Sequence, residues 1–368
     1  MQEETALDNT TPAACGETAS KPRLSLCVTT YNRAPLLKQA LAAVLTQISP
    51  AEAGQLEVVI LDNASADDTA AVVEDAKRRS PHIPLRYVRH PENIGMDRNF
   101  MEAIRAAEGE FVFLLSDDDI LLPGAVTKLL ESIQTHPELD GFCLNVCGFF
   151  HSPDERSAPG IVLSEDLVVT DPDESLRVLG GCIGFLSILA FRKSLIADSL
   201  QAGHYLSKIG TSYLESYVFL DALFEGRGIL VTPQAMVAMR AENCAPWNYF
   251  RVFVTEVHSM MVYAEQLGYA RKVTRGIEAE NLVRVRHFVS RVKIYGRGEE
   301  YWRSPQDAIR RLFGVYRFHP YVWFVVVPLM FFPRSLRPLV FRLRRLLGRP
   351  DAQSAQRATD LEMITISD

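Results

Sequence analysis

The sequence lacks a glycine-rich phosphate loop, cysteines at metal-binding spacing and an excess of basic residues. Without a glycine-rich loop after the first apolar run, neither a dinucleotide-binding fold nor a P-loop is supported. The net charge of −6 argues against a general nucleic-acid binder. Of the six cysteines, Cys143 and Cys147 are close together, and no second pair at a comparable spacing could complete a zinc site. A reduced intracellular protein is the simpler interpretation.

The N-terminal segment has no basic region followed by an apolar core, so nothing in it resembles a signal peptide. We therefore expect the folded part to remain in the cytoplasm. Residues 1–22 are acidic and rich in Thr, Ala and Pro, which predicts a disordered tail, and residues 350–368 read as a second one.

Short apolar runs and amphipathic stretches alternate along residues 24–123. Strands are predicted at 24–28, 56–61, 85–89 and 111–115, and helices at 35–48, 70–79, 98–107 and from about 123 onward. Four strand–helix repeats with short connections predict an α/β fold with a mostly parallel sheet covered by helices on both faces.

Polar side chains gather just after these predicted strands. Thr30 and Tyr31 follow the first strand, Asp62 and Asn63 follow the second, and an aspartate run at 117–119 follows the fourth. Because parallel strands end at the same edge of a sheet, the three groups should converge on one ligand crevice.

The aspartate run, Asp117 to Asp119, places three like charges side by side. Such charges repel one another unless a cation or solvent compensates them. Two interpretations stay open from the residues alone: a cation site at the sheet edge, or a solvated acidic turn before the next helix.

Four segments in order, VTTYNRA, VVILDNASADDT, NIGMDRNF and FLLSDDDILLP, resemble the inverting glycosyltransferases of family 2, which have the GT-A fold. The later segment GCIGFLSILAFRKSL resembles bacterial O-antigen sugar transferases of the abequosyltransferase-like group. The resemblance implies a GT-A-type sheet, a nucleotide-diphosphate sugar donor and a divalent cation, Mn²⁺ or Mg²⁺.

The resemblance also implies roles for single positions. Tyr31 and Asp62 match the nucleotide pocket, and Asn63 stands where the family often has a second acidic residue that reads the base. Arg98 and Asn99 match the family's Arg-Asn pair, although Arg98 could equally form a structural ion pair. Thr30 and Asp117 are expected beside the donor.

The family pattern Asp-x-Asp-Asp aligns with Ser116 to Asp119, so Ser116 replaces the first aspartate. Asp118 then matches the direct metal ligand, and Asp119 is expected to join it. Carboxylate oxygens suit Mg²⁺ or Mn²⁺, and the donor diphosphate and water would complete the shell.

An inverting transfer needs a base that deprotonates the acceptor hydroxyl. In the family this group lies past the metal motif, near the start of a helix, which matches Glu215 in GTSYLESYVFLDALFEG. Asp221 and Glu225 on the same predicted helix are alternatives, and an exposed helix glutamate is the plain reading of Glu215.

The C-terminal run PYVWFVVVPLMFF is shorter than the roughly 20 apolar residues of a spanning helix and contains Pro328, with Pro333 directly after it. Several arginines follow it with no acidic residue: Arg334, Arg337, Arg342, Arg344, Arg345 and Arg349. Residues 318–349 are therefore predicted to lie on an anionic cytoplasmic membrane surface. A re-entrant pair, or a helical pair packed on protein, remains an alternative.

At 368 residues the chain should form two domains or one large domain with appendages. We predict a GT-A domain at 23–240, with a nucleotide half (23–123) and an acceptor half (124–240), and a helical region at 241–317. The expected function is transfer of a sugar from a nucleotide donor to a lipid-linked or saccharide acceptor at the inner face of a membrane. An inactive glycan-binding scaffold is the first alternative, and a sugar nucleotidyltransferase the second.

Overall fold

The computed structural model describes residues 21–149, 152–241, 248–295 and 304–336, together with residues 338, 339 and 342. Apart from Lys21 and Pro22, the two predicted tails lie outside the described residues.

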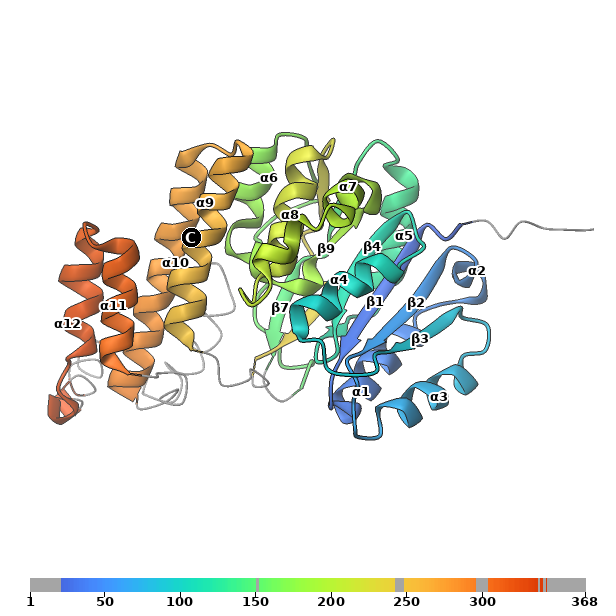
Figure 1. The fold of residues 1–368 in the computed structure, drawn as a ribbon, viewed down its shortest axis with the longest axis horizontal. Helices are drawn as coiled ribbons and strands as arrows, with labels where there is room; N and C mark the ends of the chain where they lie inside the picture. The colour runs from blue at the N-terminus through green and yellow to red at the C-terminus, as the bar shows by residue number, and fades with distance from the viewer. Residues whose placement is uncertain are drawn as a thin grey trace, which may run out of the picture.

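The predicted strands of the first half are confirmed. β1 (Leu24–Thr30), β2 (Leu56–Asp62), β3 (Leu85–Arg89) and β4 (Phe111–Ser116) pair in the parallel order β3-β2-β1-β4 (Figure 1). β1 and β2 are buried along their whole length, as expected for continuous apolar runs covered on both faces. Thr30, Asp62 and Ser116 are the last residues of their strands, and the other predicted polar residues follow directly after them.

Helices connect and flank these strands. They are α1 (Ala34–Leu45), α2 (Pro50–Ala53), α3 (Thr69–Arg79), α4 (Met96–Ala106) and α5 (Ala125–Thr135). α1 packs against α3, while α4 packs across β1, β2 and β4. α4 begins two residues before its predicted start, which places Asp97 inside its first turn.

The second half extends the same sheet in the order β4-β9-β6-β10-β8. The added strands are β6 (Gly141–Cys143), β8 (Leu167–Val169), β9 (Leu189–Arg192) and β10 (Ile229–Val231). β9 runs antiparallel to both β4 and β6, and β8 runs antiparallel to β10. A second, three-stranded sheet contains β5 (Ile120–Leu121), β7 (Val146–Phe149) and β11 (Val237–Arg240).

The second half also contains several helices, most of them short. They are α6 (Pro172–Leu179), η1 (Gly180–Gly184), η2 (Leu186–Ile188), η3 (Lys193–Ile196), α7 (Ala197–Gln201), η4 (His204–Lys208) and α8 (Leu214–Glu225). η2 contacts β4, and α8 contacts α4. The predicted strand after Ser187 is confirmed as β9.

The C-terminal region is helical, as predicted, and extends from the end of the molecule opposite β3 (Figure 1). It contains η5 (Arg251–Glu256), α9 (Val257–Leu267), α10 (Arg271–Ser290), η6 (Arg291–Tyr295), α11 (Pro305–Tyr316), η8 (Val322–Val326), α12 (Val327–Met330) and η9 (Arg334–Leu336). Val322, Val326 and Met330 are buried in a core shared with α10 and α11. In the described part of the chain, no helix combines the length and apolarity needed to cross a membrane.

Candidate functional site

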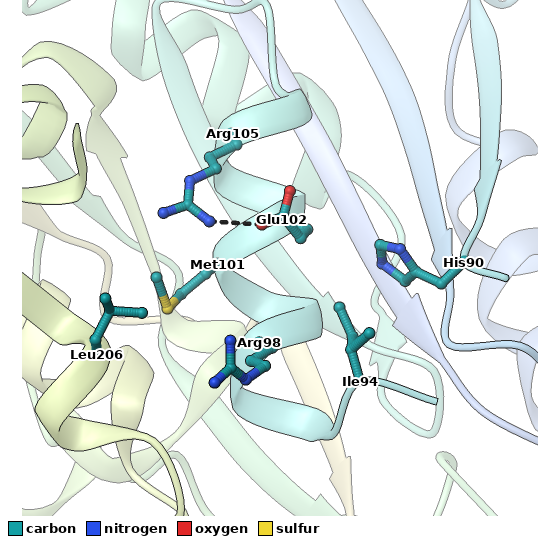
Figure 2. Close-up of a pocket in the computed structure, with 7 residues that line it drawn as sticks. All are labelled: His90, Ile94, Arg98, Met101, Glu102, Arg105 and Leu206. Carbon is teal, nitrogen blue, oxygen red and sulfur yellow. Dashed lines mark hydrogen bonds and ion pairs between the residues drawn. The ribbon is translucent and has the colours of Figure 1, made fainter. Parts of the chain in front are cut away.

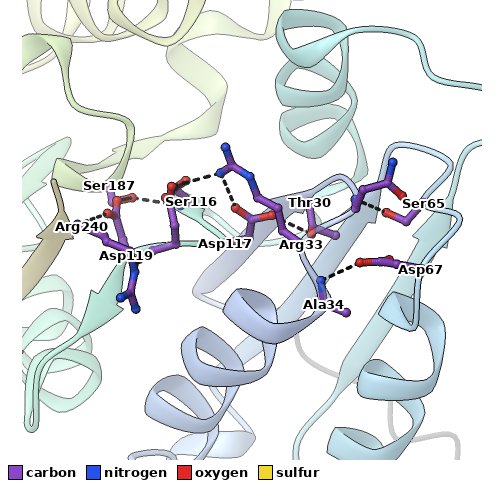
Figure 3. A network of polar contacts seen from close by, with 12 residues as sticks. Thr30, Arg33, Ala34, Ser65, Asp67, Ser116, Asp117, Asp119, Ser187 and Arg240 are labelled. Carbon is purple, nitrogen blue, oxygen red and sulfur yellow. Dashed lines mark hydrogen bonds and ion pairs between the residues drawn. The ribbon is translucent and has the colours of Figure 1, made fainter. Parts of the chain in front are cut away.

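The loops after β1 and β2 are joined by hydrogen bonds into one rim (Figure 3). The backbone amide of Asn32 donates to Ser65 Oγ at 2.8 Å, and the amide of Ala66 donates to Asn32 Oδ1 at 2.7 Å. The amide of Ala34, at the start of α1, donates to Asp67 Oδ2 at 2.9 Å. The two strand ends therefore form a fixed edge rather than independent loops.

Asp117 lies against this rim. It accepts a hydrogen bond from Thr30 Oγ1 at 2.7 Å and forms an ion pair with Arg33 Nη1 at 3.1 Å. The same Arg33 nitrogen lies 3.0 Å from Asp118 Oδ2. Burial raises the pKa of Asp117 to about 6, although Thr30 and Arg33 act in the opposite direction.

Asp118 is held by a neighbour in the sequence, whereas Asp119 is held by two residues that lie far from it in the sequence. Ser116 Oγ donates to Asp118 Oδ1 at 2.6 Å, and Ser187 Oγ donates to Asp119 Oδ2 at 2.7 Å. The backbone amide of Arg240 on β11 reaches Asp119 Oδ1 at 3.4 Å. Burial, and then the charge of Asp118, raise the pKa of Asp119 to about 8.

The chemistry of Asp118 and Asp119 fits a divalent cation. Both offer hard carboxylate oxygens, which are the ligands that Mg²⁺ and Mn²⁺ prefer, and burial holds the pKa of Asp119 above its ordinary value. Among the described residues, no group of three or more His, Cys, Asp and Glu side chains is arranged to hold a metal ion. A cation held here would therefore need further ligands from a bound diphosphate or water.

Three residues of this cluster were not predicted: Arg33, Ser187 and Arg240. Arg33 lies in VTTYNRA, the first of the segments that resemble the family, so the sequence could have indicated a place for it in the site. Ser187 lies in the segment expected to line the acceptor side, and its hydroxyl also accepts a hydrogen bond from the backbone amide of Ser116 at 3.0 Å. Arg240 comes from a strand 121 residues after Asp119, and no local pattern marks it.

Asp62 is fully buried at the end of β2, with both carboxylate oxygens engaged. Oδ1 accepts from the amide of Ser65 at 2.8 Å, while Oδ2 accepts from Tyr87 Oη at 2.6 Å and lies 3.5 Å from Arg89 Nε. These contacts hold the β2 and β3 ends together.

Asn63 and Tyr31 complete this part of the rim. Asn63 donates to Asn93 Oδ1 at 2.9 Å and accepts from the amide of Ile94 at 2.8 Å, so it fixes the loop before α4. Tyr31 is 43% exposed and is available to a ligand.

Arg98 is not brought to the aspartate run. It lines a cavity of about 280 Å³ on α4 (Figure 2), together with His90, Ile94, Met101, Glu102, Arg105 and Leu206. None of these residues belongs to the loops after β1, β2 or β4. The predicted contact of Arg98 with the nucleotide therefore rests on the family pattern alone. Asn99, the second residue of the Arg-Asn pair, is buried and donates to the carbonyl of Leu61 at 3.2 Å.

Glu215 lies in the first turn of α8 and is 5% exposed, which rules out the reading of an exposed helix glutamate. Its Oε2 atom has no hydrogen-bond partner among the residues that the structure describes. Burial, with a contribution from the charge of Asp97, raises the pKa of Glu215 to about 8.

The alternative bases are less suited to proton transfer. Both carboxylate oxygens of Asp221 accept hydrogen bonds at 2.6 Å, one from Tyr205 Oη and the other from Tyr263 Oη. This network makes Asp221 a structural residue. Glu225 is exposed at the last turn of α8.

Comparison with known proteins decides the family. A model of glycosyl transferase family 2 matches residues 25–186. Abequosyltransferase RfbV of Salmonella typhimurium is 31% identical over 246 residues, which cover 60% of this chain and 67% of the relative. The chain belongs to glycosyltransferase family 2.

A further relative of this family 2 chain is the GalNAc(5)-diNAcBac-PP-undecaprenol beta-1,3-glucosyltransferase of Campylobacter jejuni. It is 32% identical over 197 residues, which cover 53% of this chain and 60% of the relative. The chain thus spans about three fifths to two thirds of the length of these two proteins.

Solved structures confirm the GT-A-type fold of this family 2 protein. S. aureus TarS 1–349 in complex with UDP-GlcNAc superposes with a TM-score of 0.57 at 18% identity, covering 89% of this chain and 92% of that one. Mannosyltransferase PcManGT from Pyrobaculum calidifontis, in complex with GDP-Man and Mn²⁺, gives a TM-score of 0.50 at 18% identity, covering 87% of each chain.

Proposed function

We propose that this family 2 protein is an inverting glycosyltransferase of cell-surface polysaccharide synthesis. It would move a sugar from a nucleotide-diphosphate sugar to a lipid-linked or saccharide acceptor. The observation that carries the proposal is the convergence of Thr30, Asp62 and Asp117–Asp119 on one rim of the sheet, with a buried carboxyl of raised pKa, Glu215, in the second half. One named relative is an abequosyltransferase and the other is a glucosyltransferase named for a GalNAc(5)-diNAcBac-PP-undecaprenol, which fits this interpretation.

The donor would lie along the rim. Tyr31, Asp62 and Asn63 are proposed to contact the nucleotide, and Thr30 and Asp117 to flank the diphosphate. Asp118 and Asp119 would hold Mn²⁺ or Mg²⁺, which supplies positive charge to the leaving diphosphate when bound. Arg33, already paired with Asp117 and Asp118, adds a fixed cation to the same place.

Glu215 is proposed as the base. As the acceptor hydroxyl attacks the anomeric carbon, its O–H bond breaks and the proton passes to the Glu215 carboxylate. A new C–O bond forms on one face of the sugar while the bond to the diphosphate breaks on the other, and the electron pair leaves with the nucleotide. A carboxylate with a pKa near 8 is a stronger base than an exposed one, which favours this step.

The C-terminal helices are proposed to contact an anionic membrane surface on the cytoplasmic side. Large apolar side chains are exposed there, with Phe318 at 84% and Phe324 at 82%. Arg310 on α11, which pairs with Asp307, and Arg317 directly after this helix are exposed as well. Sunken aromatic side chains beside arginines are typical of peripheral attachment, and a lipid-linked acceptor would be presented at such a surface.

Release of nucleoside diphosphate from a panel of UDP- and GDP-sugars tests the enzymatic proposal. With purified protein and water as acceptor, we expect metal-stimulated release from one or a few donors. Lack of release from every donor, with Mn²⁺ and with Mg²⁺, would instead favour the glycan-binding scaffold.

Sedimentation with lipid vesicles tests the membrane proposal separately. We expect binding to vesicles that contain phosphatidylglycerol, and a several-fold loss of it in a Phe318→Ser/Phe324→Ser variant. Val162, which is 71% exposed outside this region, provides the control as Val162→Ser. Equal losses in both variants would contradict a specific membrane face.

A further inference from the structure

The short helices η1 and η2, residues 180–188, contact several parts of the proposed site. At the end of this segment the Ser187 hydroxyl donates to Asp119, which ties the segment to the strand-end cluster, Asp117–Asp119. Upstream, η1 packs against α8, which carries Glu215, and against α10. The segment therefore links the proposed donor edge to the helix of the proposed base and to the C-terminal helices.

Two glycines of η1 let side chains from other elements lie directly against its backbone. A Cβ at Gly181 would lie 2.6 Å from Cζ of Arg284, and a Cβ at Gly184 would lie 2.9 Å from Cε1 of Tyr213. Both distances are shorter than the contact distance of two carbon atoms, so glycine is what makes room for these side chains. Arg284 belongs to α10, and Tyr213 directly precedes α8. A guanidinium and the ring at the entry to α8 thus share one short helix as their seat.

The Arg284 guanidinium has no anion of its own in the described part of the chain. Its side chain is partly buried, and none of the described residues forms an ion pair or a hydrogen bond with it. The carbonyl of the residue, by contrast, accepts from Tyr249 Oη at 3.4 Å. Arg33 differs in this respect, because it pairs with two aspartates of the strand-end cluster. A partly buried cation without a counter-charge is suited to binding an anionic ligand.

The charge of Arg284 acts at the entry to α8. Burial raises the pKa of the Tyr213 hydroxyl, the charge of Glu215 adds to this effect, and the charge of Arg284 opposes it. This agrees with the contacts of the two side chains, which lie against glycines three residues apart in η1. An anion bound to Arg284 would therefore lie beside the entry to the helix of the proposed base.

α10 also connects this place to the helices proposed to contact a membrane (Figure 1). Val285 and Phe288 of α10 are buried in one core with Val326 of η8. On η8 itself, Phe324 is 82% exposed. One side of α10 therefore places Arg284 against η1, while another side packs on the helix that presents Phe324.

We propose that Arg284 binds the phosphate group that joins the acceptor glycan to its lipid. The planar guanidinium matches two phosphate oxygens at once, which a lysine could not do. Arg284 lies between the proposed base and the proposed membrane face, where the junction of glycan and lipid would lie during transfer. The inference rests on the proposed function and deepens it, because it names the acceptor class as a glycan on a lipid phosphate or diphosphate.

Binding of farnesyl diphosphate, measured by calorimetry in EDTA, tests this site without donor or turnover. EDTA removes the cations that could hold a diphosphate at the strand-end cluster, whose carboxylates alone would repel it. We expect farnesyl diphosphate to bind at least about tenfold more tightly than farnesol, which lacks the phosphates. Equal binding of the two compounds would overturn the proposal.

Variants assign this binding to Arg284. Arg284→Gln should weaken the binding of farnesyl diphosphate by about 10–100-fold, the usual contribution of hydrogen bonds to a charged group. Arg275→Gln is the control, because Arg275 is exposed and lies nine residues earlier, on the opposite side of α10. It should bind as tightly as the unaltered protein. Unchanged affinity in Arg284→Gln, or an equal loss in the control, would contradict the assignment.

Gly181→Ala moves the guanidinium without removing its charge. The added Cβ would overlap Arg284, whose side chain can shift, so the variant should fold and bind farnesyl diphosphate more weakly. Thermal unfolding without ligand checks the fold. In the Arg284→Gln background the same substitution should cost little, because the group that it displaces is already gone. Fully additive losses would show that the two positions act separately, and the proposed seat would be wrong.

Inorganic pyrophosphate separates a lipid phosphate from a free one. We expect it to bind more weakly than farnesyl diphosphate, and equal affinity would overturn the lipid part of the proposal. The release of nucleoside diphosphate described above judges the proposed function by itself. Absence of release from every donor would count against the enzyme, whereas the binding of farnesyl diphosphate to the variants decides the role of Arg284.

Discussion

At the ends of β1 and β4 every carboxylate oxygen of Asp117, Asp118 and Asp119 accepts a contact from the chain. At the start of α8, in contrast, Glu215 keeps one oxygen without a partner, as does Asp97 on α4, within the region that the structure covers. The strand-end cluster is therefore stabilised without a ligand and would exchange chain contacts for ligand contacts. Glu215, by contrast, keeps the cost of burying an unpaired oxygen until a hydrogen-bond donor binds beside it.

The difference follows from what surrounds each group. Hydroxyls and the Arg33 guanidinium contact the strand-end cluster, so each of its carboxylates has partners from the chain itself. The neighbours of Glu215 offer burial and a second carboxylate, and both favour the protonated form. A ligand-binding role suits the first environment and a proton-transfer role suits the second.

The largest expected effect comes from Glu215. Glu215→Gln should lower turnover by about 10²–10⁴-fold, the usual contribution of a general base, while donor binding stays intact. Steady-state release of nucleoside diphosphate and calorimetric donor titration measure the two quantities. Glu225→Gln, on the exposed end of the same helix, is the control. Comparable losses in both variants would remove the distinction between the two carboxylates.

At the strand ends, Asp118→Asn should weaken metal-dependent donor binding. Loss of an outer-shell partner commonly costs about 10–100-fold in metal affinity, and a direct ligand should cost at least as much. Titration of Mn²⁺ in the presence of the donor measures the change. Asp75→Asn, at an exposed position paired with Arg78 and Arg79, should leave the titration unchanged. If donor binding by Asp118→Asn kept its normal dependence on metal, the assignment of Asp118 as a metal ligand would be wrong.

A smaller effect is expected when a partner is removed and the carboxylate is left in place. Ser187→Ala deprives buried Asp119 of the hydroxyl at 2.7 Å. An unsatisfied buried acceptor costs about 1–3 kcal/mol, so the free energy of unfolding in urea should fall by that amount. Ser259→Ala removes only an exposed hydroxyl on α9 and should change stability by less than about 0.5 kcal/mol. If the two serines behaved alike, the strand-end cluster would not depend on its partners.

The smallest effect concerns Asp62. Tyr87→Phe removes the hydroxyl that donates to Oδ2, but Arg89 remains 3.5 Å from the same oxygen. We therefore expect a loss of about 1 kcal/mol in the free energy of unfolding. Chemical denaturation of the single variant and of a Tyr87→Phe/Arg89→Gln double variant measures how far Arg89 compensates for the lost hydroxyl. A double variant no worse than Tyr87→Phe would show that Arg89 does not compensate.

The first half of the fold could be predicted because local hydrophobic patterns in the sequence indicate its strands and helices. Continuous apolar runs fix the four parallel strands, and polar residues directly after them fix the rim. The second half could not be predicted in the same detail. β6, β8, β9 and β10 are only three or four residues long, and their mixed parallel and antiparallel pairing depends on partners far away in the sequence.

The candidate site divides along the same line. The aspartate run and Glu215 stand in recognisable segments, so the sequence alone indicated them. Ser187 and Arg240 reach Asp119 only through tertiary contacts. The burial of Asp97 beside α8 is likewise not visible in the local sequence. Asp221, an alternative base from its helical position, proved to be held by two tyrosines. Residue type and spacing show what chemistry is available, but only packing shows which group is left free to perform it.

The Ser187 hydroxyl also sets an order of events during synthesis on the ribosome. It binds Asp119 and the amide of Ser116, which precedes it by 71 residues. At about 5–20 residues per second, Ser187 is made about 4–14 s after Ser116. The parallel strands can be complete while the aspartates still lack this partner. The nascent chain can therefore form its four parallel strands first, and the aspartates gain the Ser187 hydroxyl only when the following segment has been synthesised.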